Sequence, residues 1–207
     1  MSTQPASSDI PLHMTPEEGA LFRKGLRRAK TYIEFGSGGS TIVAAENEQL
    51  SAIYSVESDK KWIKHLLNVP IIRSSVEAKR LHLIHANIGP TQAWGHPVAI
   101  DGAYPFPQLY HNYFSAPWKN MLPVNPDAIL IDGRFRVATI IMAALIVENQ
   151  QCLYYVHDYV DSRDYSVIEH FFSRKHNADT LSIFMRKKNF DKKTALTTLC
   201  RYAAQPD

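Results

Sequence analysis

Side chains that can do acid–base or electrostatic chemistry stand where short apolar runs of this sequence end. Asp132 follows the run Ala-Ile-Leu-Ile and precedes Arg134 and Arg136, whereas His157 and Asp158 follow the run Leu-Tyr-Tyr-Val. Histidine and carboxylates can remove a proton from a hydroxyl group, and the reference pKa of histidine lies near neutral pH. Two carboxylates can instead hold a divalent cation, and arginines can bind an anion through paired hydrogen bonds.

A second group of residues surrounds a glycine turn. Residues 34–40 read Glu-Phe-Gly-Ser-Gly-Gly-Ser, between an apolar run that begins at Thr31 and a segment at 41–48 compatible with a helix. A strand, a glycine turn and a helix in this order place backbone N–H groups against a nucleotide-bearing ligand. Glu57 ends the next strand-like run, 21 residues after Gly36 (57 − 36), close to the ~20-residue spacing of an acid that binds a ribose.

Alternating strands and helices must position these residues. Thr15, Pro16 and Glu18 indicate an N-terminal helix over 15–29 with a capping box. We expect later helices at 59–67, 137–148, 162–172 and 192–202, and strands at 52–56, 80–85, 127–132, 152–156 and 181–185. This alternation predicts a single α/β domain over 1–207, with a doubly wound, mostly parallel, Rossmann-like sheet and helices on both faces. Ligands then bind at the carboxyl ends of the strands.

The segment at 89–124 interrupts the alternation. It carries six prolines and many aromatic residues, Trp118 among them. A stretch of this length between strands is usually functional or disordered, and its aromatic content argues against disorder. It is either an aromatic-rich cap over the carboxyl end of the sheet or a surface excursion that packs on its own aromatics or forms an oligomer contact. As a cap, it offers Trp118 to an acceptor.

The glycine turn of residues 34–40 and the later run Tyr-Ser-Val-Glu at 54–57 together resemble the first two motifs of class I S-adenosylmethionine-dependent methyltransferases. The resemblance reaches Asp158 and covers most of the chain. It departs from the family at Ser40, where many members carry a third glycine. It implies that S-adenosylmethionine lies over the turn, that Glu57 binds its ribose hydroxyls, and that Asp132 faces both methyl donor and acceptor. The implied cofactor-binding residues are Glu34, Gly36, Ser37, Gly38, Ser40, Glu57, Asn87 and Asp132.

Several of these residues have plainer explanations. Glu34 is either a solvent-linked acid at a strand end or a residue that orders the turn and approaches the amino group of the cofactor. Asn87 follows the third strand, where the family often places Asp or Asn against the adenine, but asparagine is also an ordinary turn residue. Asp132 can simply cap the following helix. Arg134 and Arg136 either bind an anionic acceptor or are ordinary surface arginines.

Two mechanisms remain open for the strand-end acids. In the favoured one, His157 or Asp158 acts as the general base while a methyl group moves to a small-molecule hydroxyl. In the other, Asp132 and Asp158 bind a divalent cation, which resembles cation-dependent catechol-type O-methyltransferases. Those enzymes use a further Asn or Asp, which Tyr159 does not supply, so we do not favour a metal.

Composition limits the partners and the alternatives. The net charge of +3 is too small to indicate nucleic-acid binding, and no apolar segment is long enough to span a membrane. Met1 to Asp9 hold no apolar core of a signal peptide, and two distant cysteines fit a reducing cytoplasm. The sequence does not specify the oligomeric state. Two other functions remain: an NAD-binding oxidoreductase, which shares the glycine turn and ribose acid, and a methyltransferase-like domain that binds ligand without turnover.

Overall fold

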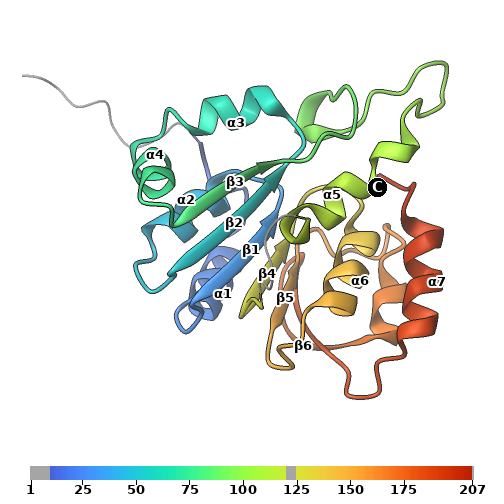
Figure 1. Cartoon of the computed structure of the whole chain (residues 1–207). Helices are drawn as coiled ribbons and strands as arrows, with labels where there is room; N and C mark the ends of the chain where they lie inside the picture. Colours follow the sequence, from blue (N-terminus) through green and yellow to red (C-terminus); the bar gives the residue numbers. More distant parts are fainter. Residues whose placement is uncertain (1–9, 120–124, 207) are drawn as a thin grey trace, which may run out of the picture.

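A computed structural model of the chain describes residues 10–119 and 125–206 (Figure 1). Two sequence predictions therefore fall on residues that the structure does not describe. They concern the polar stretch at 1–9 and the end of the expected cap at 120–124. Within the described ranges, no helix is long and apolar enough to cross a membrane.

One sheet of seven strands forms the centre of the described part of the molecule, in the order β3-β2-β1-β4-β5-β7-β6. The strands are β1 (Thr31–Phe35), β2 (Ala52–Glu57), β3 (Leu81–His85), β4 (Ala128–Ile131), β5 (Leu153–Val156), β6 (Phe172–Ala178) and β7 (Leu181–Arg186). Strands β1 to β5 run parallel, whereas β7 is antiparallel to both of its neighbours. The order changes direction at β1 and β4, so the ends of these two strands form the switch point where ligands bind in such sheets.

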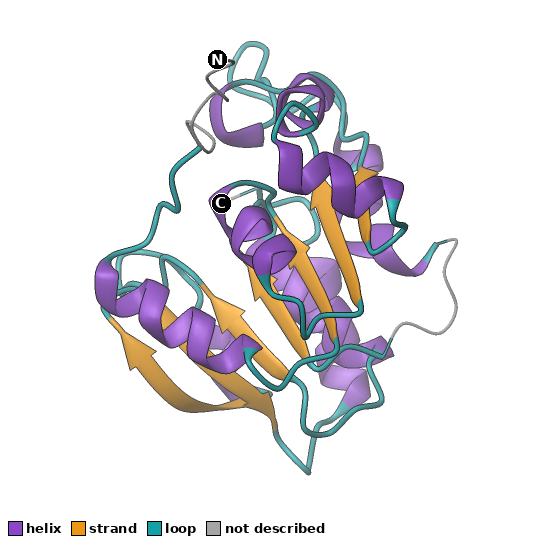
Figure 2. Cartoon of the chain, turned by 90° about the vertical axis from the view of Figure 1, so that its left-hand side faces the viewer, coloured by secondary structure: helices purple, strands orange, loops and turns teal. Residues whose placement is uncertain are grey.

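Helices cover both faces of the sheet (Figures 1 and 2). They are α1 (Pro16–Leu26), α2 (Gly39–Glu46), α3 (Lys60–Leu66), α4 (Pro70–Glu77), α5 (His111–Ser115), α6 (Arg136–Ile146) and α7 (Lys192–Tyr202). Buried residues of α1 to α4 join one apolar cluster, and those of α5 to α7 join the other. The predicted doubly wound, mostly parallel sheet with helices on both faces is confirmed.

The sheet separates the two clusters because successive side chains of a strand point to opposite faces. In β1, Ile33 and Phe35 enter the cluster beneath α5 to α7, and Tyr32 enters the cluster beneath α1 to α4. Every side chain of β4 is buried, which explains why that sequence is continuously apolar rather than alternating.

The helix predicted over 162–172 is wrong. Residues Ser166–His170 form a short 3-10 helix, and β6 begins at Phe172 and pairs with β7. The segment is an edge strand with a register shift between Arg174 and His176. Edge strands often carry exposed basic residues and irregularities that discourage further pairing, so β6 lacks the apolar alternation that identifies a strand.

Other elements differ in their limits. The N-terminal helix ends at Leu26 rather than at 29, and α4, which starts at Pro70, was not predicted. The expected cap at 89–124 divides into two parts. Its first part lines the ligand cleft described below, whereas Tyr110 and Phe114 are buried beneath α6 in the core. Tyr113 is also buried in that core, and it lines the cleft.

Candidate active site at the carboxyl ends of the strands

The glycine turn brings the ends of β1 and β4 into contact. Gly36 has a φ of 96°, in the left-handed region, and its N–H donates to Val56 O at 2.9 Å. A Cβ added to Gly36 would lie 3.0 Å from the carbonyl carbon and oxygen of Asp132. Both the conformation and the close approach require glycine, and they place Asp132 beside the turn.

The side chain of Glu34 stabilises the glycine turn through hydrogen bonds. Its side chain is fully buried and accepts hydrogen bonds from Ser40 Oγ at 2.8 Å, Ser55 Oγ at 2.6 Å, Tyr32 OH at 3.0 Å and the Thr41 hydroxyl. Burial raises the pKa of Glu34 to about 7 although these hydroxyl groups oppose the rise. The role of Ser40, where the family often has glycine, is to bind Glu34.

Glu57 lies at the edge of the cleft, with 7% of its surface exposed. Its Oε2 accepts from Ser37 N at 3.2 Å, and its Oε1 accepts from the backbone of Ser58 at 2.6 Å and of Asp59 at 2.8 Å. Burial raises the pKa of Glu57, and these N–H donors oppose the rise. The carboxylate is thus fixed between the glycine turn and the start of α3.

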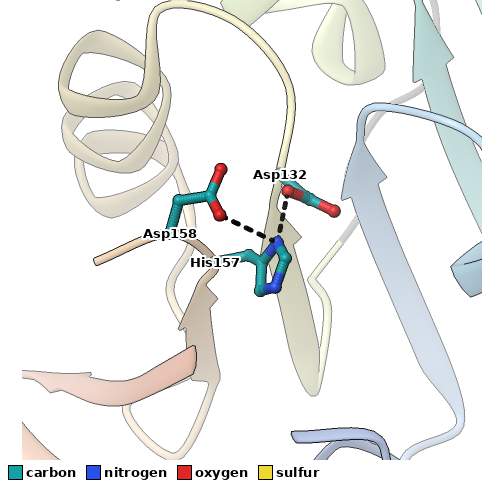
Figure 3. Close-up of side chains that lie close together, drawn as sticks. All are labelled: Asp132, His157 and Asp158. Atoms are coloured by element: carbon teal, nitrogen blue, oxygen red, sulfur yellow. Dashed lines mark hydrogen bonds and ion pairs between the residues drawn. The ribbon is translucent and has the colours of Figure 1, made fainter. Parts of the chain in front are cut away.

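Asp132, His157 and Asp158 lie together at the ends of β4 and β5 (Figure 3). His157 Nδ1 is 2.9 Å from Asp132 Oδ1 and 3.8 Å from Asp158 Oδ1. Its Nε2 is 3.3 Å from Oε2 of Glu18, which lies on α1. Burial alone would lower the pKa of His157, but Asp132, Asp158 and Glu18 together raise it.

Glu18 is a neighbour of the site that sequence reasoning missed. It closes the predicted capping box, accepting from Thr15 N at 2.8 Å, and it also accepts from Thr180 N at 2.8 Å and Thr180 Oγ1 at 2.7 Å. Burial alone would raise the pKa of Glu18, but these hydrogen bonds and His157 lower it to about 2. The capping box was visible in the sequence, but nothing there indicated the contact with His157.

Arg136 is a buried residue that lines the cleft, so it is not an ordinary surface arginine. Its side chain is 2% exposed, and its Nη2 is 3.0 Å from Asp158 Oδ2 and 3.6 Å from Asp132 Oδ1. Burial would raise the pKa of Asp158, but Arg136, His157 and Arg163 together lower it. Arg134 and Arg163 also line the cleft, and sequence reasoning missed Arg163.

One cleft of about 1400 Å³ joins most of these residues. At one end it is lined by Glu57, Trp62, His65 and the segment 93–96, and at the other by Asp158, Arg163, Tyr165 and Tyr202. The glycine-turn residues Gly36, Ser37, Gly38 and Ser40 lie between these ends with Asp132, Arg134, Arg136 and His157.

Three predicted site residues lie outside the residues that line the cleft. Glu34 is buried beneath the turn. Asn87 is exposed and accepts from Gly89 N at 3.0 Å. Trp118 packs in the core with its ring centroid 6.0 Å from that of Phe35. Aromatic content alone could not distinguish Trp118, which fills the core, from a cleft residue.

A strap formed by residues 10–14 lines the same cleft ahead of α1. A Cβ added to Gly39 would lie 2.5 Å from Leu12 Cα, so the strap rests directly on the start of α2. The rings of His13 and Trp94 meet edge to face with centroids 5.4 Å apart. The strap therefore contacts both the helix that follows the glycine turn and the segment 93–96.

No protein-family model matches the chain, and a search of curated proteins finds no match. Among solved structures, a methyltransferase-like protein from Silicibacter pomeroyi has a TM-score of 0.80 and 28% identity, covering 95% of this chain and 98% of its own. A methyltransferase from Geobacter sulfurreducens has a TM-score of 0.52 and 8% identity, over 84% of this chain and 80% of that one. The C-terminal domain of precorrin-6Y C5,15-methyltransferase from Rhodobacter capsulatus has a TM-score of 0.52 and 12% identity, over 88% and 94%. The last two similarities concern the fold alone.

Proposed function

By its fold the chain belongs to the class I S-adenosylmethionine-dependent methyltransferases, and we propose that it transfers a methyl group from S-adenosylmethionine to an oxygen atom of a small molecule. One observation carries the proposal. The glycine turn, Glu57 and Asp132 converge on a cleft of about 1400 Å³ at the switch point of the sheet. Pockets for one ligand commonly measure about 300–1000 Å³, so this cleft has room for a donor and an acceptor together.

The donor belongs at the end that contains Glu57. The backbone of Gly36, Ser37 and Gly38 runs along the cleft there, close to the start of α2. Glu57 is placed to accept hydrogen bonds from ribose hydroxyls, as the acid after the second strand does in this class of fold. We assign the adenine to the space lined by Ser58, Trp62 and the segment 93–96, because Asn87 lies outside the cleft lining.

The acceptor belongs at the opposite end, beside Asp132 and Asp158. In-line transfer from a sulfonium mainly requires that donor and acceptor are held close and aligned. Tyr165 and Tyr202 offer aromatic faces there, and the guanidinium group of Arg163 offers hydrogen-bond donors to a polar group of the acceptor.

A carboxylate is a better candidate than His157 for the group that receives the acceptor proton. Both ring nitrogens of His157 face carboxylates, at 2.9 Å in Asp132 and 3.3 Å in Glu18. Carboxylates only accept hydrogen bonds, so this geometry suits the doubly protonated ring, and a charged histidine has no free lone pair for a base. Asp132 and Asp158, with side chains 26% and 38% exposed, both reach the cleft.

Two alternatives remain testable. An NAD-binding oxidoreductase would share the glycine turn and Glu57, and a domain that binds ligand without turnover would keep the cleft. Thermal unfolding with S-adenosylhomocysteine or NADH separates the first from methyl transfer. We expect S-adenosylhomocysteine at a hundredfold excess over its Kd to stabilise the protein by about 2.7 kcal/mol, or about 5–10 °C. Stabilisation by NADH alone would contradict the proposal.

Turnover needs its own experiment. Asp132→Asn should leave the affinity for S-adenosylhomocysteine within about threefold while it removes methyl transfer from labelled S-adenosylmethionine to a panel of phenols and hydroxy acids. A protein that binds cofactor but methylates no acceptor in that panel, with or without the substitution, would favour the binding domain.

The free thiols of Cys152 and Cys200 are consistent with our proposal that the protein resides in the cytoplasm.

A further inference from the structure

Arg136 lies at the point where the two loops that carry the strand-end acids meet. It is the first residue of α6, and it is almost completely buried. Its Nε donates to Gly133 O at 3.0 Å, and its Nη1 donates to His157 O. One guanidinium group thus joins the loop after β4 to the loop after β5.

The same group lies between two carboxylates. Nη2 of Arg136 donates to Asp158 Oδ2 at 3.0 Å and is 3.6 Å from Asp132 Oδ1. His157 adds a second positive group, 2.9 Å from Asp132, and Glu18 balances it from α1. Arg163 completes the set, with Nη2 3.6 Å from Asp158 Oδ2. The carboxylates of Glu18, Asp132 and Asp158 therefore all lie next to basic side chains of the protein itself. These are Arg136, His157 and Arg163.

The positions of these charged groups determine whether the cluster of Asp132, His157 and Asp158 can bind a divalent cation. Ligand atoms of Asp132, His157 and Asp158 lie within 4.8 Å of one another, as they do in metal sites. A metal ligand must present a lone pair, yet the His157 nitrogen nearest Asp132 is placed to donate to it. A Mg²⁺ or Ca²⁺ ion bound to both carboxylates at about 2.0–2.6 Å would also lie against the Arg136 guanidinium. The residues do not fit the ion.

We propose that Arg136 takes the place of a divalent cation in this site and is a positioning residue that holds Asp132 and Asp158 at the cleft. The assignment of these carboxylates to an acceptor rests on the proposed function; the exclusion of the metal does not. Arginine suits the position because its planar fork can donate to two loops and two carboxylates at once, which the single ammonium of lysine cannot do.

Binding of Mn²⁺, followed by electron paramagnetic resonance, tests the proposal. We expect the wild-type protein to leave Mn²⁺ free, and Arg136→Met to bind it at least about tenfold more tightly through the uncompensated carboxylates. Arg136→Lys keeps the charge and should exclude the ion as the wild type does. Arg186→Met is the matched control, because Arg186 is a partly buried arginine that, like Arg136, donates to backbone carbonyl groups, here those of Ala144 and Val147 away from the cleft.

Two results would overturn the proposal. One is stoichiometric Mn²⁺ binding by the wild type that Asp132→Asn or Asp158→Asn abolishes. The other is a folded Arg136→Met protein that binds Mn²⁺ no better than Arg186→Met. If Arg136→Met does not fold, the wild-type titration decides, since site-dependent binding contradicts the proposal and its absence supports it. None of these measurements needs S-adenosylhomocysteine, so a failure of the proposed function would be recognised separately, by a lack of cofactor binding.

Discussion

Three buried glutamates surround the cleft, and their neighbours give them different roles. Glu34 lies beneath the glycine turn, where burial raises its pKa to about 7 and hydroxyl groups hold it. Glu18 faces His157, and hydrogen bonds and charge overcome burial and lower its pKa to about 2. Glu57 alone of the three lines the cleft. The surroundings rather than the residue type therefore decide which acid can meet a ligand.

Glu57→Gln should weaken binding of S-adenosylhomocysteine by about tenfold to a hundredfold. A hydrogen bond to a charged group contributes about 1.5–3 kcal/mol, and each 1.4 kcal/mol is about tenfold in Kd. Isothermal titration calorimetry measures the change. Glu46→Gln, at the exposed C-terminal end of α2, is the control and should bind as the wild type does. Equal affinities for all three proteins would remove Glu57 from the cofactor site.

The charge on His157 should make stability depend on pH. Its pKa is raised above 6.5 in the folded protein, so the stabilising contribution is complete below the unfolded-state pKa and is lost as pH rises through the folded-state pKa. We expect His157→Gln to cost about 1–3 kcal/mol at pH 6 and progressively less at higher pH. Urea unfolding from pH 6 to 9 measures this difference, with exposed His176→Gln as the control. A cost that is constant over this range would mean that His157 is neutral when folded.

Some site residues could be predicted from the sequence because local rules govern them. Gly36 and Glu57 belong to a turn and a strand end whose spacing follows from the βαβ unit. The role of Arg136 could not be predicted, because burial against two loops 25 residues apart (157 − 132) depends on how β4 and β5 pair. The position of Trp118 in the core could not be predicted for the same reason, because it depends on tertiary packing.

At the scale of elements, α1 and the strap of residues 10–14 behave as one unit. The capping box of Thr15 and Glu18 fixes the start of α1, and the same Glu18 reaches His157 and Thr180. The strap then continues from this anchored point across the cleft to Gly39. We infer that a local helix-capping interaction also sets the position of the segment that covers the start of α2.

Gly39→Ala should therefore loosen the strap. The added methyl group would overlap Leu12, and overpacking of this kind typically costs about 1–3 kcal/mol. We expect faster amide hydrogen exchange in a peptide covering residues 10–18. Gly38→Ala is the matched control, because a Cβ there meets nothing within 4 Å and its φ of 176° is extended. If exchange rises equally in both variants, the strap does not rest on Gly39.

Element prediction succeeded where the hydrophobic period was clear. The C-terminal helix was predicted over 192–202 and observed as Lys192–Tyr202, and the buried β4 was recognised as a continuous apolar run. It failed at β6, where Phe172 is buried but the four residues from Arg174 to Asn177 are exposed. An edge strand pairs with one neighbour only, here β7. Its own sequence therefore gives little indication that it forms a strand.

The described molecule has two apolar clusters, one on each face of a single sheet. The strands of the sheet separate them, and β1, β2, β4, β5 and β7 contribute buried side chains to both. The clusters are therefore layers of one fold, because neither can keep its packing if the central strands separate. This organisation supports our assignment of the chain to one domain.

That assignment predicts one cooperative unfolding transition. Trp62 packs on the side of α1 to α4, and Trp118 packs on the side of α5 to α7, so tryptophan fluorescence reports on both layers. Urea unfolding followed by fluorescence and by far-ultraviolet circular dichroism should give coincident curves, as two-state domains do. Variants Trp62→Phe and Trp118→Phe, each combined with Trp94→Phe to remove the exposed third tryptophan, then isolate the signal of each layer, and each should keep one midpoint for both probes. Midpoints that separate between the two layers would show that the faces of the sheet unfold independently, and a single-domain description would be wrong.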